Sequence, residues 1–70
     1  MGIISMYKYY MLHRWFSPGT YPKNGNLIDH GDYDYRTEVE PGVWAWSWLV
    51  YSEPLTEKEI FDYELKEAMK

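Results

Sequence analysis

Cysteine is absent from the 70 residues of the chain. Without thiols, disulfide bonds, thiolate zinc sites and cysteine nucleophiles are excluded, and the composition fits a reducing compartment. Long apolar runs are also missing, since no stretch approaches the roughly 20 residues that a membrane-spanning helix needs. Residues 1–6 lack the basic start of a secretory signal. We therefore expect a cytoplasmic protein with no membrane partner.

Acidic residues are absent from residues 1–28, whereas all eleven lie from Asp29 onward. Lys8, Arg14 and Lys23 make the first part basic, although the whole chain carries a net charge of -4. An acidic field of this kind opposes random contact with nucleic acid and favours basic partners. A solvated acidic surface without a partner is the plainer interpretation.

Aromatic side chains are abundant, with eight Tyr, four Trp and two Phe. Each such ring can bury about 150–250 Å². A few rings can therefore supply much of the core that so short a chain needs. The length leaves no room for a second domain, so we expect residues 1–70 to form one.

The first part of the chain predicts one strand followed by a loop. Residues 6–16 are rich in aromatic side chains and lack Gly and Pro, which favours a strand. Residues 17–26 contain the turn signals Ser17-Pro18-Gly19 and Asn24-Gly25, and they predict a loop. Residues 27–30 are a candidate for a short edge strand.

A β-hairpin is predicted at residues 33–39 and 44–52. Bulky and charged side chains alternate in the first segment, and large and small ones alternate at the start of the second. Pro41 fits the second position of the connecting turn, and Gly42 supplies a positive φ at the third. The turn predicts a register in which four pairs share one face: Val39 with Trp44, Thr37 with Trp46, Tyr35 with Trp48, and Tyr33 with Val50. We expect this face to be the core, with a ligand-stacking platform of tryptophans as the alternative.

The last element is predicted as a helix over residues 57–69. Thr56 and Glu59 have the spacing of a capping box, and Leu55 and Ile60 have that of a hydrophobic staple. An apolar stripe at helical spacing is expected to pack on the tryptophan face: Phe61, Leu65, Ala68 and Met69.

These elements predict an α+β fold, a small antiparallel sheet of three to four strands with one C-terminal helix packed on one face. The face without the helix is the candidate surface for a protein partner or a second copy of the chain. It would present Tyr10 and Leu12 of the first strand and Leu49 and Tyr51 of the hairpin. A second candidate, for a basic partner, is the set of acids Asp29, Asp32 and Asp34.

Catalytic residue types are present, but no spacing selects them. Ser17, His13 and Asp29 can be grouped as a hydrolytic triad only arbitrarily. The acidic segment from Asp29 to Asp34 does not follow the calcium-binding EF-hand pattern. We therefore predict no catalytic residue, no metal site and no cofactor, and a metal enzyme at this acidic turn stays a third hypothesis.

The basic residues suggest a different function. Lys8, Arg14 and Lys23 alternate with Tyr and Trp, residue types that neutralise phosphates and stack bases on single-strand-binding sheets. A small nucleic-acid-binding module is therefore the alternative function, although the acidic remainder of the chain opposes it.

Three segments resemble a known family: RWFSPGTYP at residues 14–22, WSWLVYSEPLT at residues 46–56 and IFDYEL at residues 60–65. The family comprises small domains of conjugative elements, plasmids and phages of Gram-positive bacteria, similar to the domains associated with large polyvalent proteins. The resemblance implies an accessory role in a mobile genetic element, of a kind that protects it from host defences. It carries over no catalytic residues.

The sequence as a whole favours a non-catalytic accessory protein that acts by binding another protein. Small acidic proteins can inhibit nucleic acid enzymes by placing carboxylates where phosphates would lie in a basic channel. Neither the partner nor the choice between the acidic and the apolar surface follows from the sequence.

Overall fold

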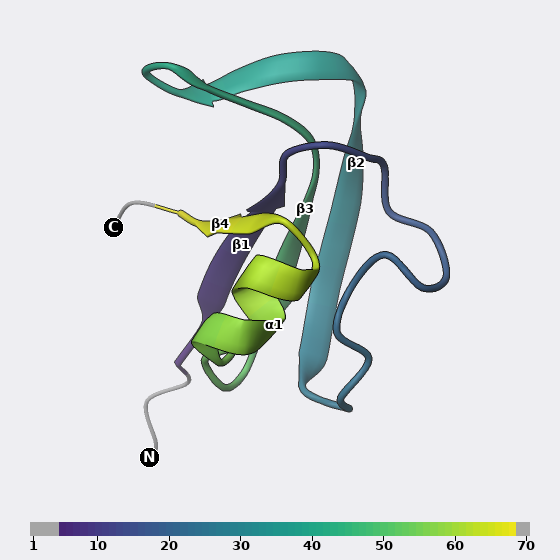
Figure 1. Cartoon of the computed structure of the whole chain (residues 1–70), viewed down its shortest axis with the longest axis vertical. Helices are drawn as coiled ribbons and strands as arrows, with labels where there is room; N and C mark the ends of the chain where they lie inside the picture. Colours follow the sequence, from purple (N-terminus) through teal and green to yellow (C-terminus); the bar gives the residue numbers. More distant parts are fainter. Residues whose placement is uncertain (1–4, 69–70) are drawn as a thin grey trace.

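Residues 5–68 are described by the structure, which is a computed structural model. They form one antiparallel sheet with the strand order β2-β3-β1-β4, and the single helix lies against one face of it (Figure 1). The α+β class and this arrangement of sheet and helix are as predicted. The elements are β1 (Tyr7–Met11), β2 (Leu27–Glu40), β3 (Val43–Tyr51), α1 (Glu57–Asp62) and β4 (Leu65–Glu67).

The core lies between the sheet and α1. On the core side, four residues of β3 have no exposed surface: Ala45, Ser47, Leu49 and Tyr51. Antiparallel pairing puts Tyr9 opposite Leu49 and Met11 opposite Ser47, which brings the buried side of β1 to the same face. Leu55 and Leu65 complete the cluster from the far end of the chain.

The tryptophans of β3 lie on the opposite side of the sheet, so the prediction that they face the core is wrong. Trp44 is 45% exposed, and Trp46 and Trp48 are half-buried. Trp46 makes an edge-on contact with Trp15, with ring centroids 4.7 Å apart. The indole of Trp48 lies over Gly31, where an added Cβ would come within 2.6 Å of it.

Small side chains explain why this side of β3 is buried. The backbone N–H of Phe16 donates to Ser47 Oγ at 2.9 Å, and the Ser47 hydroxyl donates to Asp32 Oδ1 at 2.5 Å. The loop of residues 12–26 can approach the sheet this closely because the side chain at Ser47 is small. An indole at this position would hold the loop away.

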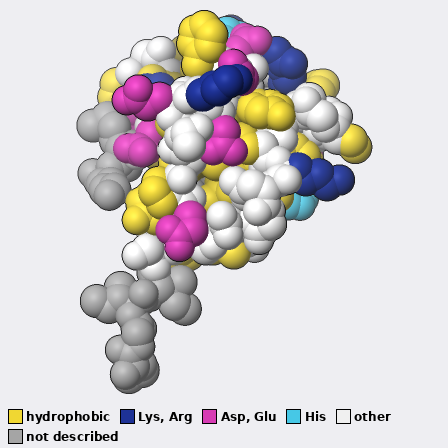
Figure 2. Space-filling view, turned by 60° about the horizontal axis from the view of Figure 1, so that its bottom comes forward, with side chains coloured by type: hydrophobic (Ala, Val, Ile, Leu, Met, Phe, Trp, Pro, Cys, Tyr) yellow, Lys and Arg dark blue, Asp and Glu magenta, His cyan; other side chains and the backbone are white. Residues whose placement is uncertain are grey.

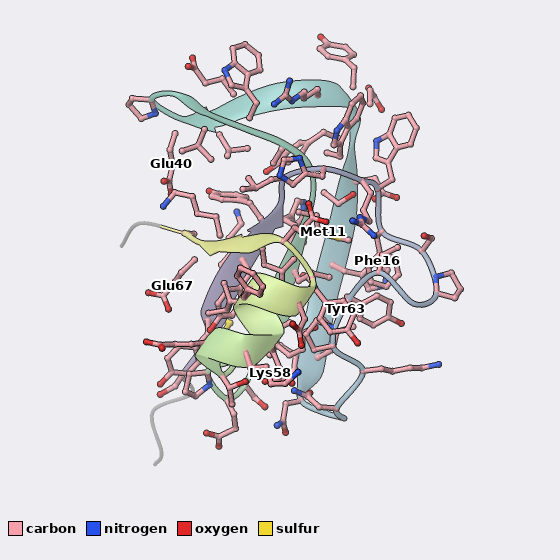
Figure 3. All side chains as sticks on the ribbon, viewed as in Figure 1. Met11, Phe16, Glu40, Lys58, Tyr63 and Glu67 are labelled. Carbon is pink, nitrogen blue, oxygen red and sulfur yellow. The ribbon has the colours of Figure 1, made fainter. Side chains whose placement is uncertain are left out.

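The loop supplies part of the cover over the core. The ring of Phe16 stacks on Tyr21 and on His30, with centroids 4.3 Å and 4.0 Å away, and it lies between the loop and β2 (Figure 3). The Tyr51 hydroxyl donates to the carbonyl of Pro22 at 2.7 Å. Burial raises the pKa of this phenol, and the nearby Glu59 carboxylate raises it further.

The predicted strand at residues 6–16 is shorter in the structure, where β1 ends at Met11. The segments predicted as a short strand at 27–30 and as the first arm of the hairpin are one continuous strand, β2. The turn is as predicted, since Gly42 has a φ of 78° and Glu40 pairs with Val43.

The predicted hairpin register holds only at the turn. Thr37 pairs with Ala45 and Asp32 pairs with Ser47, and the register shifts between these two pairs. Such irregularities bend a strand, and Figure 1 shows the β2–β3 arm turning sharply away from the rest of the sheet. The four pairs predicted to share the tryptophan face therefore do not form.

The helix begins as predicted but ends early. The Glu59 N–H donates to Thr56 Oγ1 at 3.1 Å, and the Thr56 N–H donates to Glu59 Oε1 at 2.9 Å, which is a complete capping box. Glu64 then adopts a φ of 54°, a left-handed conformation that typically terminates a helix.

The chain after Glu64 forms β4 instead of the predicted helical turns as far as residue 69. Leu65 pairs with Met11 and is 6% exposed, whereas Phe61, predicted to lie on the packed stripe, is 82% exposed. The apolar stripe is therefore wrong, although Leu65 still reaches the core. Met69, its last member, lies outside the described residues.

Candidate functional site

The strand β2 is one edge of the sheet, because its only neighbour in the described residues is β3. It carries exposed acids, Asp29 and Asp34, and two large exposed apolar side chains, Ile28 at 49% and Tyr35 at 72%. An edge strand presents unpaired backbone groups and can accept another strand. The combination makes β2 a candidate contact surface for a protein.

The third predicted acid, Asp32, serves the fold. Its Oδ1 accepts from the Ser47 hydroxyl at 2.5 Å and lies 3.3 Å from the N–H of Phe16. Asp29 makes a local hydrogen bond, in which Oδ1 accepts from the N–H of His30 at 2.9 Å. Asp29 and Asp34 are therefore the acids that a partner could engage without disturbing the core.

Two of the four residues predicted to form the apolar contact face are buried in the core. Leu49 and Tyr51 have no exposed surface, so the structure corrects their assignment to an outer contact face. Tyr10 does lie on the side away from α1, opposite Trp48, but only 7% of it is exposed. Burial raises the pKa of Tyr10, with a further contribution from Glu40.

The predicted basic residues have separate surroundings. Lys8 Nζ lies 5.4 Å from the ring centroids of Tyr10 and Trp48, which is cation–π geometry. Arg14 donates to Glu64 Oε1 at 2.6 Å, beside the end of α1. Lys23 is exposed in the loop between β1 and β2. These contacts spread the three charges over different parts of the fold.

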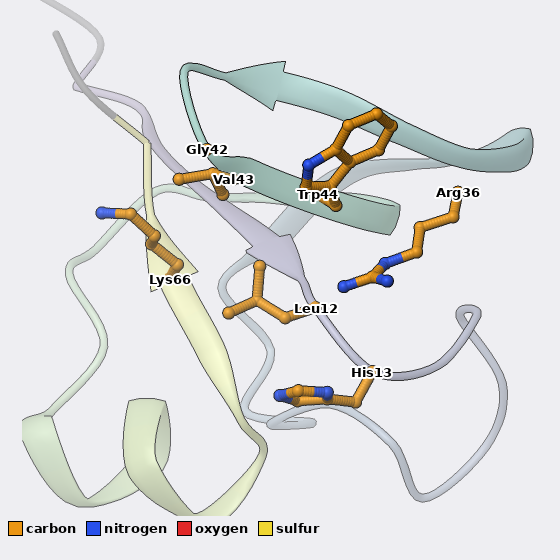
Figure 4. A pocket seen from close by; sticks show the side chains of 7 residues that line it. All are labelled: Leu12, His13, Arg36, Gly42, Val43, Trp44 and Lys66. Carbon is orange, nitrogen blue, oxygen red and sulfur yellow. The ribbon is translucent and has the colours of Figure 1, made fainter.

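A cleft that sequence reasoning missed lies where the bent hairpin arm meets the ends of β1 and β4 (Figure 4). Its volume is about 300 Å³. It is lined by Leu12, His13, Arg36, Gly42, Val43, Trp44 and Lys66. Leu12, predicted to lie on a partner surface, is thus part of this cleft.

Among the residues that the structure describes, no acidic side chain lines the cleft, although the chain contains eleven acids. Two acids close to the lining residues have partners: Glu64 Oε1 accepts from Arg14 and its Oε2 lies 3.6 Å from His13 Nε2, and Glu38 Oε2 accepts from the Gly42 N–H at 3.1 Å. Elsewhere the surface is mixed, and on the face in Figure 2 acidic side chains lie among hydrophobic and basic ones. The cleft is therefore a local basic site on an acidic protein.

The arbitrary triad does not assemble. His13 lies against Glu64, and Ser17 bonds with Thr20 within its own turn. Within residues 5–68 no three His, Asp or Glu side chains are grouped as a metal ion requires. None of the helices described is long and apolar enough to cross a membrane.

Comparison with known proteins gives one family. The family model described as defence against restriction A C-terminal matches residues 4–70, which is almost the whole chain. No curated protein and no solved structure matches.

Proposed function

Because the chain belongs to the defence against restriction A C-terminal family, we propose that it is a non-catalytic module that counters restriction by binding a protein of the host restriction system. It acts as an accessory protein of a mobile genetic element. Its contact surface is the edge strand β2, and it requires no cofactor.

The observation that carries the proposal is the composition of this edge. A long edge strand with exposed apolar side chains is an aggregation hazard unless charges or a cover protect it. In β2 the exposed acids supply these protective charges, while Ile28 and Tyr35 are exposed beside them. An edge that is both acidic and apolar suits a basic partner that also offers apolar surface.

Restriction endonucleases bind DNA through basic surfaces, because phosphate contacts supply much of the affinity of such proteins. Carboxylates on β2 would be attracted to the same surface, and the backbone of the edge strand would add hydrogen bonds. The module would then compete with DNA for the enzyme.

The experiment measures DNA cleavage by a purified restriction endonuclease, with the chain added at increasing concentrations. We expect inhibition that weakens at high salt, since exposed charges are screened. The double variant Asp29→Lys with Asp34→Lys should lose inhibition, because it reverses the charge of the edge without touching Asp32.

The matched control is Glu53→Lys with Glu67→Lys, which changes the net charge equally at exposed residues outside β2. Retained inhibition by this control, with loss in the β2 variant, supports the proposal. Equal inhibition by both variants would show that β2 is not the contact surface. The proposed function itself would be refuted if the chain neither inhibited nor bound, by calorimetry, restriction enzymes of different types.

A further inference from the structure

The cleft beside the hairpin arm is lined by two cations and an exposed indole: Arg36, Lys66 and Trp44. Within the described part of the chain, neither Arg36 nor Lys66 has an ion-pair partner, whereas Arg14 and Lys58 both do. Both cations line the same cleft, although the Lys66 ammonium points away from Arg36 (Figure 4). An anion bound there would be attracted by both charges.

The side chains are arranged around an apolar floor. Arg36 extends toward Leu12 from one side, Lys66 lies on the other side of Leu12, Trp44 lies above them and His13 lies below (Figure 4). Guanidinium groups bind phosphate through two parallel hydrogen bonds. An imidazole can add a third donor, and in His13 this would be Nδ1, because Nε2 lies 3.6 Å from Glu64 Oε2. One wall of the cleft therefore fits a phosphate group.

Trp44 supplies a second recognition element. Its indole is 45% exposed, and among residues 5–68 no other aromatic ring stacks on it. An exposed indole next to a phosphate site is the arrangement with which proteins stack a nucleobase. The volume of about 300 Å³ is at the lower end of the range for ligand pockets, so it fits one nucleotide.

From this juxtaposition we infer that the cleft binds a single nucleotide, with the base against Trp44 and the phosphate on Arg36 and His13. Lys66, on the other side of Leu12, contributes a second positive charge near the phosphate. The inference does not rest on the proposed role of β2, although Arg36 belongs to that strand. The ligand is either a free nucleotide or the phosphorylated end of a strand, and the net charge of -4 opposes binding of a longer polyanion.

The experiment is isothermal titration calorimetry of the full chain with adenosine monophosphate, adenosine and inorganic phosphate. Adenosine monophosphate should bind more tightly than either fragment, because only it engages both the ring and the cations. Arg36→Gln should weaken its binding about tenfold or more, and Trp44→Ala should weaken it by a similar factor. Circular dichroism shows that both variants are folded.

The matched control is Lys58→Gln, which removes one positive charge from α1 at a residue that pairs with Asp62. Its affinity should equal that of the parent chain. A 5′-phosphorylated oligonucleotide that binds as tightly as adenosine monophosphate identifies a strand end as the ligand. Tighter binding of the monophosphate alone identifies a free nucleotide.

Three results would overturn the inference. The first is no binding of adenosine monophosphate, and the second is binding that Arg36→Gln and Trp44→Ala leave unchanged. The third is equal affinity for acetyl-Phe-Asp, a dipeptide with an aromatic ring and carboxylates, which would assign the cleft to an acidic protein segment instead.

Discussion

The position of the core predicts that truncating one apolar side chain lowers stability strongly, whereas truncating another changes it little. Leu49 has no exposed surface, and Leu49→Ala leaves a cavity between the sheet and its cover. Substitutions of this kind cost about 2–5 kcal/mol. Small domains are stable by about 0.05–0.15 kcal/mol per residue, which gives about 4–10 kcal/mol for 70 residues. Leu49→Ala should therefore remove a large fraction of the free energy of unfolding.

Phe61 is the control, because it is larger than leucine yet 82% exposed on α1. Phe61→Ala removes little buried surface and gains helix propensity, so we expect a change within about 0.5 kcal/mol. Urea unfolding followed by circular dichroism measures both free energies. A cost below about 1 kcal/mol for Leu49→Ala, or a larger cost for Phe61→Ala, would refute the assignment of the core.

Three further predictions concern a cap, a close contact and a buried phenol. Thr56→Ala removes the acceptor of the Glu59 N–H, and thermal unfolding should show a loss of about 1 kcal/mol. Gly31→Ala places a methyl group about 2.6 Å from the Trp48 indole, so the variant should unfold at lower urea concentration and shift the Trp48 indole signal in NMR spectra; an unchanged signal would contradict the contact. The pKa of Tyr51 is raised above its ordinary value of 10.0 by burial, so the unfolded state loses its proton first as the pH rises. Stability should therefore be complete below pH 10 and fall above it, and thermal scans should show a weaker decline for Tyr51→Phe.

Sequence patterns predicted the features that depend on neighbouring residues. The capping box at Thr56 and the positive φ of Gly42 follow from local chemistry, and both are present. The α+β class followed from the order of strand-like and helix-like segments. These features need no knowledge of what packs against them.

The buried face of β3 could not be predicted in the same way, because both of its faces are apolar. Alternation shows which residues share a face but not which face is inward. The large indole rings favoured the prediction that the tryptophans face inward. The close approach of Phe16 to Ser47 instead requires a small side chain on the buried face. That contact joins residues far apart in the sequence, and no local pattern records it.

The cleft arises from two departures from regular structure. Arg36 reaches it from the segment of β2 in which the register shifts between Asp32 and Thr37. Lys66 reaches it because the left-handed Glu64 ends α1 and turns the chain into β4. With an unshifted β2 and a helix to residue 69, these two cations would not line one cavity. A site made by irregular backbone leaves no periodic signal, so its residues are recognisable only in the folded chain.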